Sequence, residues 1–519
     1  MALSHMCTKD VENDAYDPSV PKMICTCGNV QAKQSNGFSN YVSHVKKSHK
    51  PDYEKHTAEY IQSKSSGQKS ILQFTSVTVK ARNTYVWLRW IIEDNLPFSF
   101  VEKVRTRENT KLDPISRSSV MKYLRLVTNK VEQKVKDLLP QRFGLIIDGW
   151  SSNTMHFCVL FACLPDLDIK LGRPMLAFSP LLDETSQSAQ AHLDWIKSSL
   201  RLYGMDFRNI MFLVSDNTNC MPALARLLHT KLIGCASHKL ALYVKLFLDI
   251  PLIDDEERPL HVLNKVKKLM KKLRSCSKAG ALRLETSLKP VINNATRWSS
   301  TFCMIARYIS IERFLDRTDR DIIHLLLTAP EHEEVRMLEV HLKQINDVTV
   351  LLQGDAITLS TARVLLDGIV SLNLPGADPN QHITANAAIV RFPDFESGII
   401  KLLNEQGSEL SEEEAEEVSV FIKMDVDHQD QQYEESGNYA IELLNRNKRR
   451  KKEASKYVDL SFIPATSVLC EREFSQSSLV YSELRQSMTP LHLECVLYLK
   501  HNHLLWDALL VQEVINISP

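Results

Sequence analysis

The chain has 519 residues, and its 63 lysines and arginines balance its 63 aspartates and glutamates, so its formal net charge at pH 7 is zero. At roughly 150 residues per domain, this length predicts several domains. The charge balance excludes a protein that is basic or acidic throughout, so any face that binds nucleic acid must be local. No apolar run reaches the roughly 18 residues of a membrane span, so we expect no membrane partner. The eleven cysteines form no dense framework and no signal-peptide pattern precedes them, which favours an intracellular chain with reduced thiols.

The first predicted module covers residues 20–55 and contains Cys25, Cys27, His44 and His49. Two early thiolates and two histidines on a predicted helix are the ligand set of a structural Zn²⁺ ion. The alternative is a basic helix with incidental cysteines. The pattern resembles a BED-type zinc finger, in which zinc would supply the folding energy of a module with little core. The nearby basic side chains expected to meet DNA phosphates are Lys46, Lys47 and Lys50.

Residues 56–84 are polar and predict a linker, and residues 85–140 predict a helical segment. In this segment the spacing of apolar residues predicts helices over 85–95 and 116–139, the second with Ser118 or Ser119 near its start.

Residues 141–300 predict an α/β core. Its strands are expected at 143–148, 156–164, 173–182, 210–216 and 232–235, with helices at 188–203, 220–228 and 238–248. The first and fourth strands each end on an aspartate, Asp148 and Asp216. If these strands are parallel neighbours, the two carboxylates lie side by side, where Mg²⁺ or Mn²⁺ would offset their repulsion. The alternative is that each aspartate merely ends a strand or caps the next helix.

The element order β-β-β-α-β-α-β-α is the plan of an RNase H-like fold, and such folds carry out phosphoryl transfer with two metal ions. Five motifs in order resemble those of hAT superfamily DNA transposases. They are Asp148-Gly149-Trp150-Ser151, Ser215-Asp216-Asn217, Cys235-Ala236-Ser237-His238, Thr296-Arg297-Trp298-Ser299-Ser300, and Pro464-Ala465-Thr466-Ser467 with Glu471-Arg472-Glu473-Phe474-Ser475. The resemblance covers nearly the whole chain.

The resemblance implies roles for single residues. It makes Glu471, and not Glu473, the third catalytic carboxylate beside Asp148 and Asp216. It places His238 beside the metal site, and it makes Trp298 a ring that stacks on a flipped base, with Arg297 next to it able to meet phosphate. Without the resemblance, a tryptophan is more often part of a core.

The resemblance also implies that a helical insertion, residues 301–456, splits the core. Within it, residues 406–435 are acidic and predict a solvated or disordered segment. The basic residues 447–452 are open to three interpretations: a nuclear-localisation signal, a DNA-contacting patch or an exposed loop. Residues 457–510 would complete the core and form a dimerisation region, in which apolar residues such as Leu491, Leu493 and Val496 would meet a partner subunit.

The sequence therefore predicts a multidomain α+β protein: a small zinc finger and an RNase H-like core interrupted by a mostly helical insertion. The expected function is that of a nuclear DNA transposase that cuts and joins double-stranded DNA as a homodimer or higher oligomer. Its expected cofactors are structural Zn²⁺ and catalytic Mg²⁺ or Mn²⁺. Two alternatives are a domesticated, inactive descendant that regulates transcription by binding DNA, and an RNase H-like nuclease without strand transfer.

Overall fold

The computed structural model describes residues 7–8, 22–25, 30–32, 47–48, 77–152, 154–165, 167, 171–248, 259–294, 298–423, 456–481 and 488–517. The chain divides into two compact units, Met1–Val86 with Asp507–Pro519, and Trp87–Trp506. Among the described residues, no helix is both long and apolar enough to span a membrane.

The first unit contains a small antiparallel sheet of β1 (Cys7–Thr8), β2 (Lys22–Cys25) and β3 (Val30–Ala32) in that order. It also contains the start of α4 (Val79–Glu93) and α20 (Ala508–Ile517). The backbone N–H and hydroxyl of Thr78 both donate to Oε1 of Gln512, at 2.8 and 2.5 Å. Helix α4 begins at Val79, so the predicted linker 56–84 is wrong over its last residues.

The second unit begins with a helical segment. After α4 come η2 (Phe98–Glu102), α5 (Val104–Asn109) and α6 (Arg117–Leu138). Helix α6 confirms the long amphipathic helix expected at 116–139, and its inward face is buried from Val120 to Val135. Its N-cap is Ser116, whose side chain accepts a hydrogen bond from the N–H of Ser119, and Ser118 and Ser119 lie in its first turn, near the start as expected.

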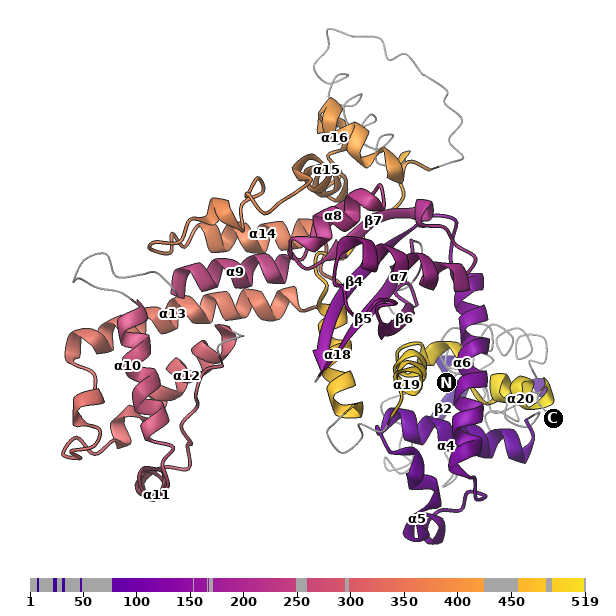
Figure 1. Ribbon diagram of the computed structural model, residues 1–519, viewed down its shortest axis with the longest axis horizontal. Coiled ribbons are helices and arrows are strands. Elements are labelled where there is room, and N and C mark those ends of the chain that lie inside the picture. The colour runs from indigo at the N-terminus through magenta and orange to yellow at the C-terminus, as the bar shows by residue number, and fades with distance from the viewer. Residues whose placement is uncertain are drawn as a thin grey trace. The chain divides into compact units, whose positions relative to one another are not determined.

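The centre of this unit is a five-stranded mixed sheet with the order β6-β5-β4-β7-β8 (Figure 1). Its strands are β4 (Phe143–Ser152), β5 (Met155–Cys163), β6 (Met175–Pro180), β7 (Ile210–Ser215) and β8 (Lys231–Gly234). The first three strands are antiparallel, whereas β7 runs parallel to β4 and β8 parallel to β7. The helices α7 (Ala189–Leu202), η3 (Phe207–Asn209) and α8 (Cys220–Leu227) lie between the strands in sequence, and α9 (Ala236–Leu248) follows β8. All five expected strands and three expected helices are present.

The first strand is longer than expected. The sequence predicted that it ends at Asp148, but β4 continues to Ser152 because β5 pairs with it over its whole length, from Gly144 opposite Cys163 to Ser152 opposite Met155. Asp148 therefore lies within a strand rather than at its end, and the interpretation as a simple strand terminator is wrong for this residue.

A helical region follows the sheet. It comprises α10 (Pro259–Lys272), α11 (Cys276–Glu285), α12 (Trp298–Ile311), η4 (Glu312–Phe314), η5 (Ile323–Leu325), α13 (Ala329–Leu352), α14 (Leu359–Val370), η6 (Pro379–Gln381), α15 (Pro393–Leu403), η7 (Gly407–Glu409), α16 (Glu412–Glu417) and η8 (Val418–Phe421). Helix α10 packs on α12 and α13, so the helical packing starts before residue 301.

The acidic segment is partly ordered. The prediction of a solvated or disordered segment is wrong over residues 407–421, where Val418 and Phe421 are buried. The carboxylate of Glu414 is buried as well, and it accepts hydrogen bonds from Ser397 Oγ and Lys401 Nζ, each at 2.6 Å. A buried carboxylate is tolerated when it is paired and hydrogen-bonded in this way. Residues 424–455, with the basic residues 447–452, lie outside the described part of the chain.

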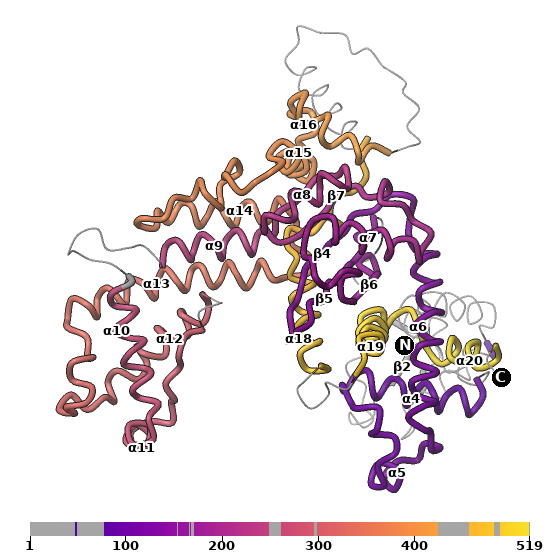
Figure 2. Tube along the Cα trace, viewed as in Figure 1, coloured from indigo at the N-terminus to yellow at the C-terminus, as the bar shows by residue number. Residues whose placement is uncertain are grey.

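The C-terminal part of the second unit returns to the sheet (Figure 2). Helix α18 (Val468–Val480) packs on β4, and α19 (Pro490–His501) packs on β6 and α6, followed by η10 (His503–Leu505). In α19, Leu493, Val496, Leu497 and Leu499 are at most 2% exposed within this single chain. The prediction that these four side chains form a dimerisation surface is therefore wrong, because the chain's own sheet and helices already cover them. Leu491, in the first turn of the helix, is 46% exposed, so for this residue a subunit contact stays a prediction.

Candidate active site

Asp148 and Asp216 occupy corresponding positions on neighbouring strands. In the parallel pair of β4 and β7, Ile146 is opposite Val214. Asp148 follows Ile146 by two residues and Asp216 follows Val214 by two, directly after β7 ends at Ser215. Because side chains alternate along a strand, this register brings the two carboxylates to the same edge of the sheet. The expected juxtaposition of the two aspartates is thus present in the fold.

Both carboxylates also accept hydrogen bonds from nearby residues. Asp148 Oδ1 accepts a hydrogen bond from the N–H of Gly149 at 2.8 Å. Asp216 Oδ1 accepts one from the hydroxyl of Thr218 at 2.9 Å. Each side chain is half-buried, so both retain access to solvent or to a ligand.

Glu471 reaches this region from the far end of the sequence. It lies in the first turn of α18, the helix that packs on β4. Three residues later on the same helix face, Phe474 stacks on Trp150 of β4, with ring centroids 6.1 Å apart and an interplanar angle of 15°. This aromatic contact fixes α18 against the strand that carries Asp148. The negative charge of Glu471 acts on Asp148 and on His238.

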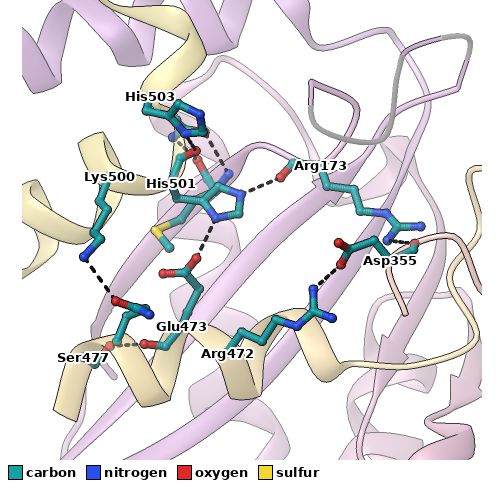
Figure 3. Close-up of polar contacts among 11 residues, drawn as sticks. Arg173, Asp355, Arg472, Glu473, Ser477, Lys500, His501 and His503 are labelled. Atoms are coloured by element: carbon teal, nitrogen blue, oxygen red, sulfur yellow. Dashed lines mark hydrogen bonds and ion pairs between the residues drawn. The ribbon is translucent and has the colours of Figure 1, made fainter. Parts of the chain in front are cut away.

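The two residues that follow Glu471 hold α18 in place (Figure 3). Arg472 forms an ion pair with Asp355 and donates to the carbonyl of Gln353, in the connection between α13 and α14. Glu473 contacts Nδ1 of His501 on α19 at 2.7 Å, and Nε2 of the same ring contacts the carbonyl oxygen of Arg173 at 2.9 Å. Glu473 is therefore committed to joining α18 to α19, which leaves Glu471 as the acid on this helix that interacts with Asp148.

The environment of Asp148 strongly disfavours its charged form. Burial is the largest cause, the negative charge of Asp216 is the second and that of Glu471 is a smaller one, and together they raise the pKa of Asp148 to about 7. The hydrogen bond from Gly149 and the positive charge of His238 act in the opposite direction. A site that gathers negative charge in this way favours a cation.

His238 supplies one positive group beside these acids. A hydrogen bond with Cys235 is the largest cause that raises its pKa, to about 9; burial opposes this, and the charges of Asp148 and Glu471 add to it. The ring is therefore protonated near neutral pH. Among the described residues, Nδ1 of His238 is buried and has no hydrogen-bond partner.

The segment before α18 closes the site from the other side. The carbonyl of Ala465 accepts a hydrogen bond from the N–H of Ala236 at 2.9 Å, and the N–H of Ser467 donates to Sγ of Cys235 at 3.3 Å. Burial alone would raise the pKa of Cys235, but the hydrogen bonds from His238 and Ser467 outweigh it and lower the pKa. Sequence reasoning did not assign this contact, and the only signal for it was the Pro-Ala-Thr-Ser motif itself.

No interaction joins Trp298 to this cluster in the described part of the chain. Trp298 is the first residue of α12 and is half-buried in a helix that packs on α10 and α13. Arg297, Lys46, Lys50, Cys27, His44 and His49 lie outside the described residues. Lys47 is described as exposed and helical, and of Cys25 only the backbone at the end of β2 is described. The zinc ligand set is therefore untested.

The basic stretch 265–289 is described, and it is only partly available to DNA. Lys265 is paired with Glu331 at 2.7 Å, and Lys278 with Asp319 at 2.5 Å and Asp321 at 2.9 Å. The remaining seven basic residues of the stretch are exposed: Lys267, Lys268, Lys271, Lys272, Arg274, Arg283 and Lys289. These seven lie on α10, on α11 and in the segments that follow these helices.

No family model and no curated protein matches this sequence. Among solved structures, the chain is similar to the Drosophila P element transposase strand transfer complex. The identity is 12%, the match covers 90% of this chain and 99% of that chain, and the TM-score is 0.32. A similarity at this TM-score supports no inference about function, so the functional argument rests on the geometry above.

Proposed function

We propose that this protein is a DNA transposase of the hAT type, which cleaves and joins DNA by metal-dependent phosphoryl transfer at Asp148, Asp216 and Glu471. The observation that carries the proposal is electrostatic. Asp216 and Glu471, from segments far apart in sequence, both act on Asp148, and burial together with these two charges raises the pKa of Asp148 to about 7. A protein that only binds DNA has no physical need for such an arrangement.

The sheet supports the same proposal. Its order, β6-β5-β4-β7-β8 with three antiparallel strands followed by two parallel ones, is the arrangement that an RNase H-like core requires. Asp148 lies on β4, and Asp216 directly follows the adjacent strand β7. The helix that carries Glu471 packs against β4.

The residues of the site fit divalent cations. Oxygen ligands from carboxylates are those that Mg²⁺ and Mn²⁺ prefer, and a cation would offset the repulsion that raises the pKa of Asp148. Asp148, Asp216 and Glu471 would hold the ions. When bound, such ions activate the attacking oxygen and stabilise the charge on the leaving oxygen.

The protein's own groups have separate tasks in this proposal. The protonated ring of His238 offers a positive charge to a phosphate oxygen of the DNA. Arg472 and Glu473 fix α18 through Asp355 and His501, so the Glu471 carboxylate is preorganised. The exposed basic residues of α10 and α11 are suited to phosphates farther along the DNA.

The remaining parts of the proposal come from the sequence. Cys25, Cys27, His44 and His49 would hold Zn²⁺ in a BED-type finger, Lys46, Lys47 and Lys50 would contact DNA, and Arg297 with Trp298 would meet an extruded base. We further propose that the protein acts in the nucleus and assembles as a homodimer. Its dimer contact must use surfaces other than the buried residues of α19.

The test uses the full-length protein and a DNA duplex that carries the inverted repeats flanking its gene. With Mg²⁺ or Mn²⁺, the wild type should nick the repeat end, and Asp148→Asn, Asp216→Asn and Glu471→Gln should each abolish nicking. Asp137→Asn, at an exposed position of α6, is the matched control and should keep full activity. Nicking by any of the three site variants would contradict the catalytic assignment. A wild type that binds the repeats but never nicks them would favour a DNA-binding regulator.

A further inference from the structure

A second cluster of metal-ligand side chains lies on the opposite face of the central sheet. Along β4, Asp148 and Trp150 point to the face covered by α18, where Trp150 stacks on Phe474. Side chains alternate along a strand, and residues directly opposite each other share a face. Cys158 and His156 are opposite Gly149 and Ser151, so they point to the other face.

Helix α7 covers that other face. Its Trp195 donates from Nε1 to the hydroxyl of Ser179, and Ser179 is opposite Cys158 in the pairing of β5 with β6. The same helix carries His192, one turn before Trp195. The third member of the cluster thus comes from the helix that packs over Cys158.

His156, Cys158 and His192 bring their ligand atoms together. One ring nitrogen of each histidine and Sγ of Cys158 all lie within 4.8 Å of one another. Cys158 and His192 are 0% and 5% exposed, and His156 is half-buried. In a tetrahedral zinc site with bonds of about 2.0 to 2.3 Å, the ligand atoms lie roughly 3.3 to 3.8 Å apart. A side-chain adjustment of about 1 Å therefore closes the cluster around one ion.

Neighbouring groups hold both imidazoles in a ligand-ready form. Nδ1 of His192 lies 2.9 Å from the carbonyl oxygen of Ser188, which can only accept, so this nitrogen carries the proton and Nε2 has the free electron pair. Nδ1 of His156 lies 2.9 Å from Oγ of Ser151. Oxygen partners on the second ring nitrogen are the usual support of histidines that bind a metal.

Gly149 makes room for the His156 ring. A Cβ atom at this position would lie 2.8 Å from both Cε1 and Nε2 of His156, closer than atoms can approach. The absence of a side chain at Gly149 therefore leaves room for the imidazole of His156 beside β4.

We propose that His156, Cys158 and His192 bind one Zn²⁺ ion, with water in the fourth position. A thiolate and two imidazoles suit Zn²⁺ better than Mg²⁺, which prefers oxygen. The nearest further thiol, Cys220 at the start of α8, lies with Sγ 3.8 Å from Nδ1 of His192 and 3.5 Å from the carbonyl oxygen of Gln187. Cys220 lies beside Nδ1 of His192, the nitrogen that carries the proton, whereas the ion would be bound at Nε2. Cys220 is therefore not one of the ligands. The ion would tie α7 to β5 behind the strand that carries Asp148.

The test measures zinc by mass spectrometry in full-length protein purified without chelator. Every sample carries Cys25→Ser and Cys27→Ser, so that the proposed finger contributes nothing. This protein should contain about one Zn²⁺ per chain, and adding Cys158→Ser should remove it. Cys163→Ser is the matched control: Cys163 is equally buried on the same strand but faces away from the cluster, so its zinc content should not change.

A second measurement tests the proposal if the Cys158→Ser protein does not fold. His156 is half-buried, so His156→Asn should be tolerated, and it should weaken binding of added Co²⁺ by at least about 10-fold while Cys220→Ser leaves it unchanged. The thiolate-to-Co²⁺ absorption band should be present in the Cys220→Ser protein. Three results would overturn the assignment. They are equal zinc content in the Cys158→Ser and Cys163→Ser proteins, a Co²⁺ affinity that His156→Asn leaves unchanged, and loss of zinc in the Cys220→Ser protein. None of these results depends on DNA cleavage.

Discussion

Replacing Asp148 by Asn should make the metal-free protein more stable, although it removes a residue of the proposed active site. The pKa of Asp148 is about 7 against an ordinary value of 3.8. Each pKa unit corresponds to about 1.4 kcal/mol, so ionising Asp148 costs the folded state at most about 4 kcal/mol above pH 7. The side chain is half-buried and water screens part of this cost, so we expect a gain of about 1 to 3 kcal/mol for Asp148→Asn.

The sign of the pH dependence follows from linkage. An acid whose pKa is raised in the folded state contributes stability that is complete below its unfolded pKa of 3.8 and is lost as the pH rises through about 7. The Asp148→Asn protein has no acid at this position, so it does not lose this stability as the pH rises. Its advantage over the wild type should therefore be largest and constant above pH 7, and should shrink steadily between pH 7 and pH 4.

The assay is thermal unfolding of both proteins in EDTA across this pH range. For a domain of about 150 to 250 residues, 1 kcal/mol corresponds to about 2 to 4 °C in Tm. Adding MgCl2 should raise the Tm of the wild type and not that of the variant. A variant that melts at or below the wild-type temperature at pH 8 would refute the argument that Asp216 and Glu471 act on Asp148 in the folded protein.

The other predictions separate the roles of neighbouring residues. Glu471→Gln should lose Mn²⁺ binding with little change in Tm. Glu473→Gln should lower the Tm, because weakening the hydrogen bond between Glu473 and His501 costs about 1 to 3 kcal/mol. If Glu471→Gln lowered the Tm and Glu473→Gln lost Mn²⁺ binding, the roles of the two residues would be exchanged. Binding to DNA should weaken steeply between about 50 and 200 mM salt. Lys268→Gln should reduce this salt dependence, and Lys265→Gln should not, because Lys265 is already paired with Glu331. Equal effects of the two substitutions would contradict DNA binding by the exposed basic residues of α10. Full-length protein should lose about one Zn²⁺ when the two finger cysteines are replaced, and unchanged zinc would exclude the finger.

The central strands were predictable because their apolar runs are long and end in polar residues. What the sequence did not show was pairing: the hairpin with β5 extends β4 beyond Asp148 to Ser152, and this depends on a partner strand rather than on local composition. For the same reason, the apolar residues of α19 were assigned to a subunit contact. An apolar pattern shows that a helix face is buried. It does not show whether the same chain or a partner subunit buries it.

The candidate site was predictable in part. The position of two aspartates after similar apolar runs was enough to place them on adjacent strands, but Glu471 is 255 residues beyond Asp216 in the sequence, and only motif resemblance connected it to them. The cluster of His156, Cys158 and His192 gave no local signal. His156 and Cys158 are two residues apart on β5, and His192 is on α7, more than thirty residues later. Only the position of α7 over the sheet brings the three side chains together.

The most direct test of the central claim is a crystal structure of the protein with Mn²⁺, in which anomalous scattering locates the ions. We predict Mn²⁺ bound by the carboxylates of Asp148, Asp216 and Glu471, with Glu473 still in contact with His501. A structure in which Mn²⁺ is absent from these three residues, or in which Glu471 points away from the two aspartates, would contradict the proposed active site.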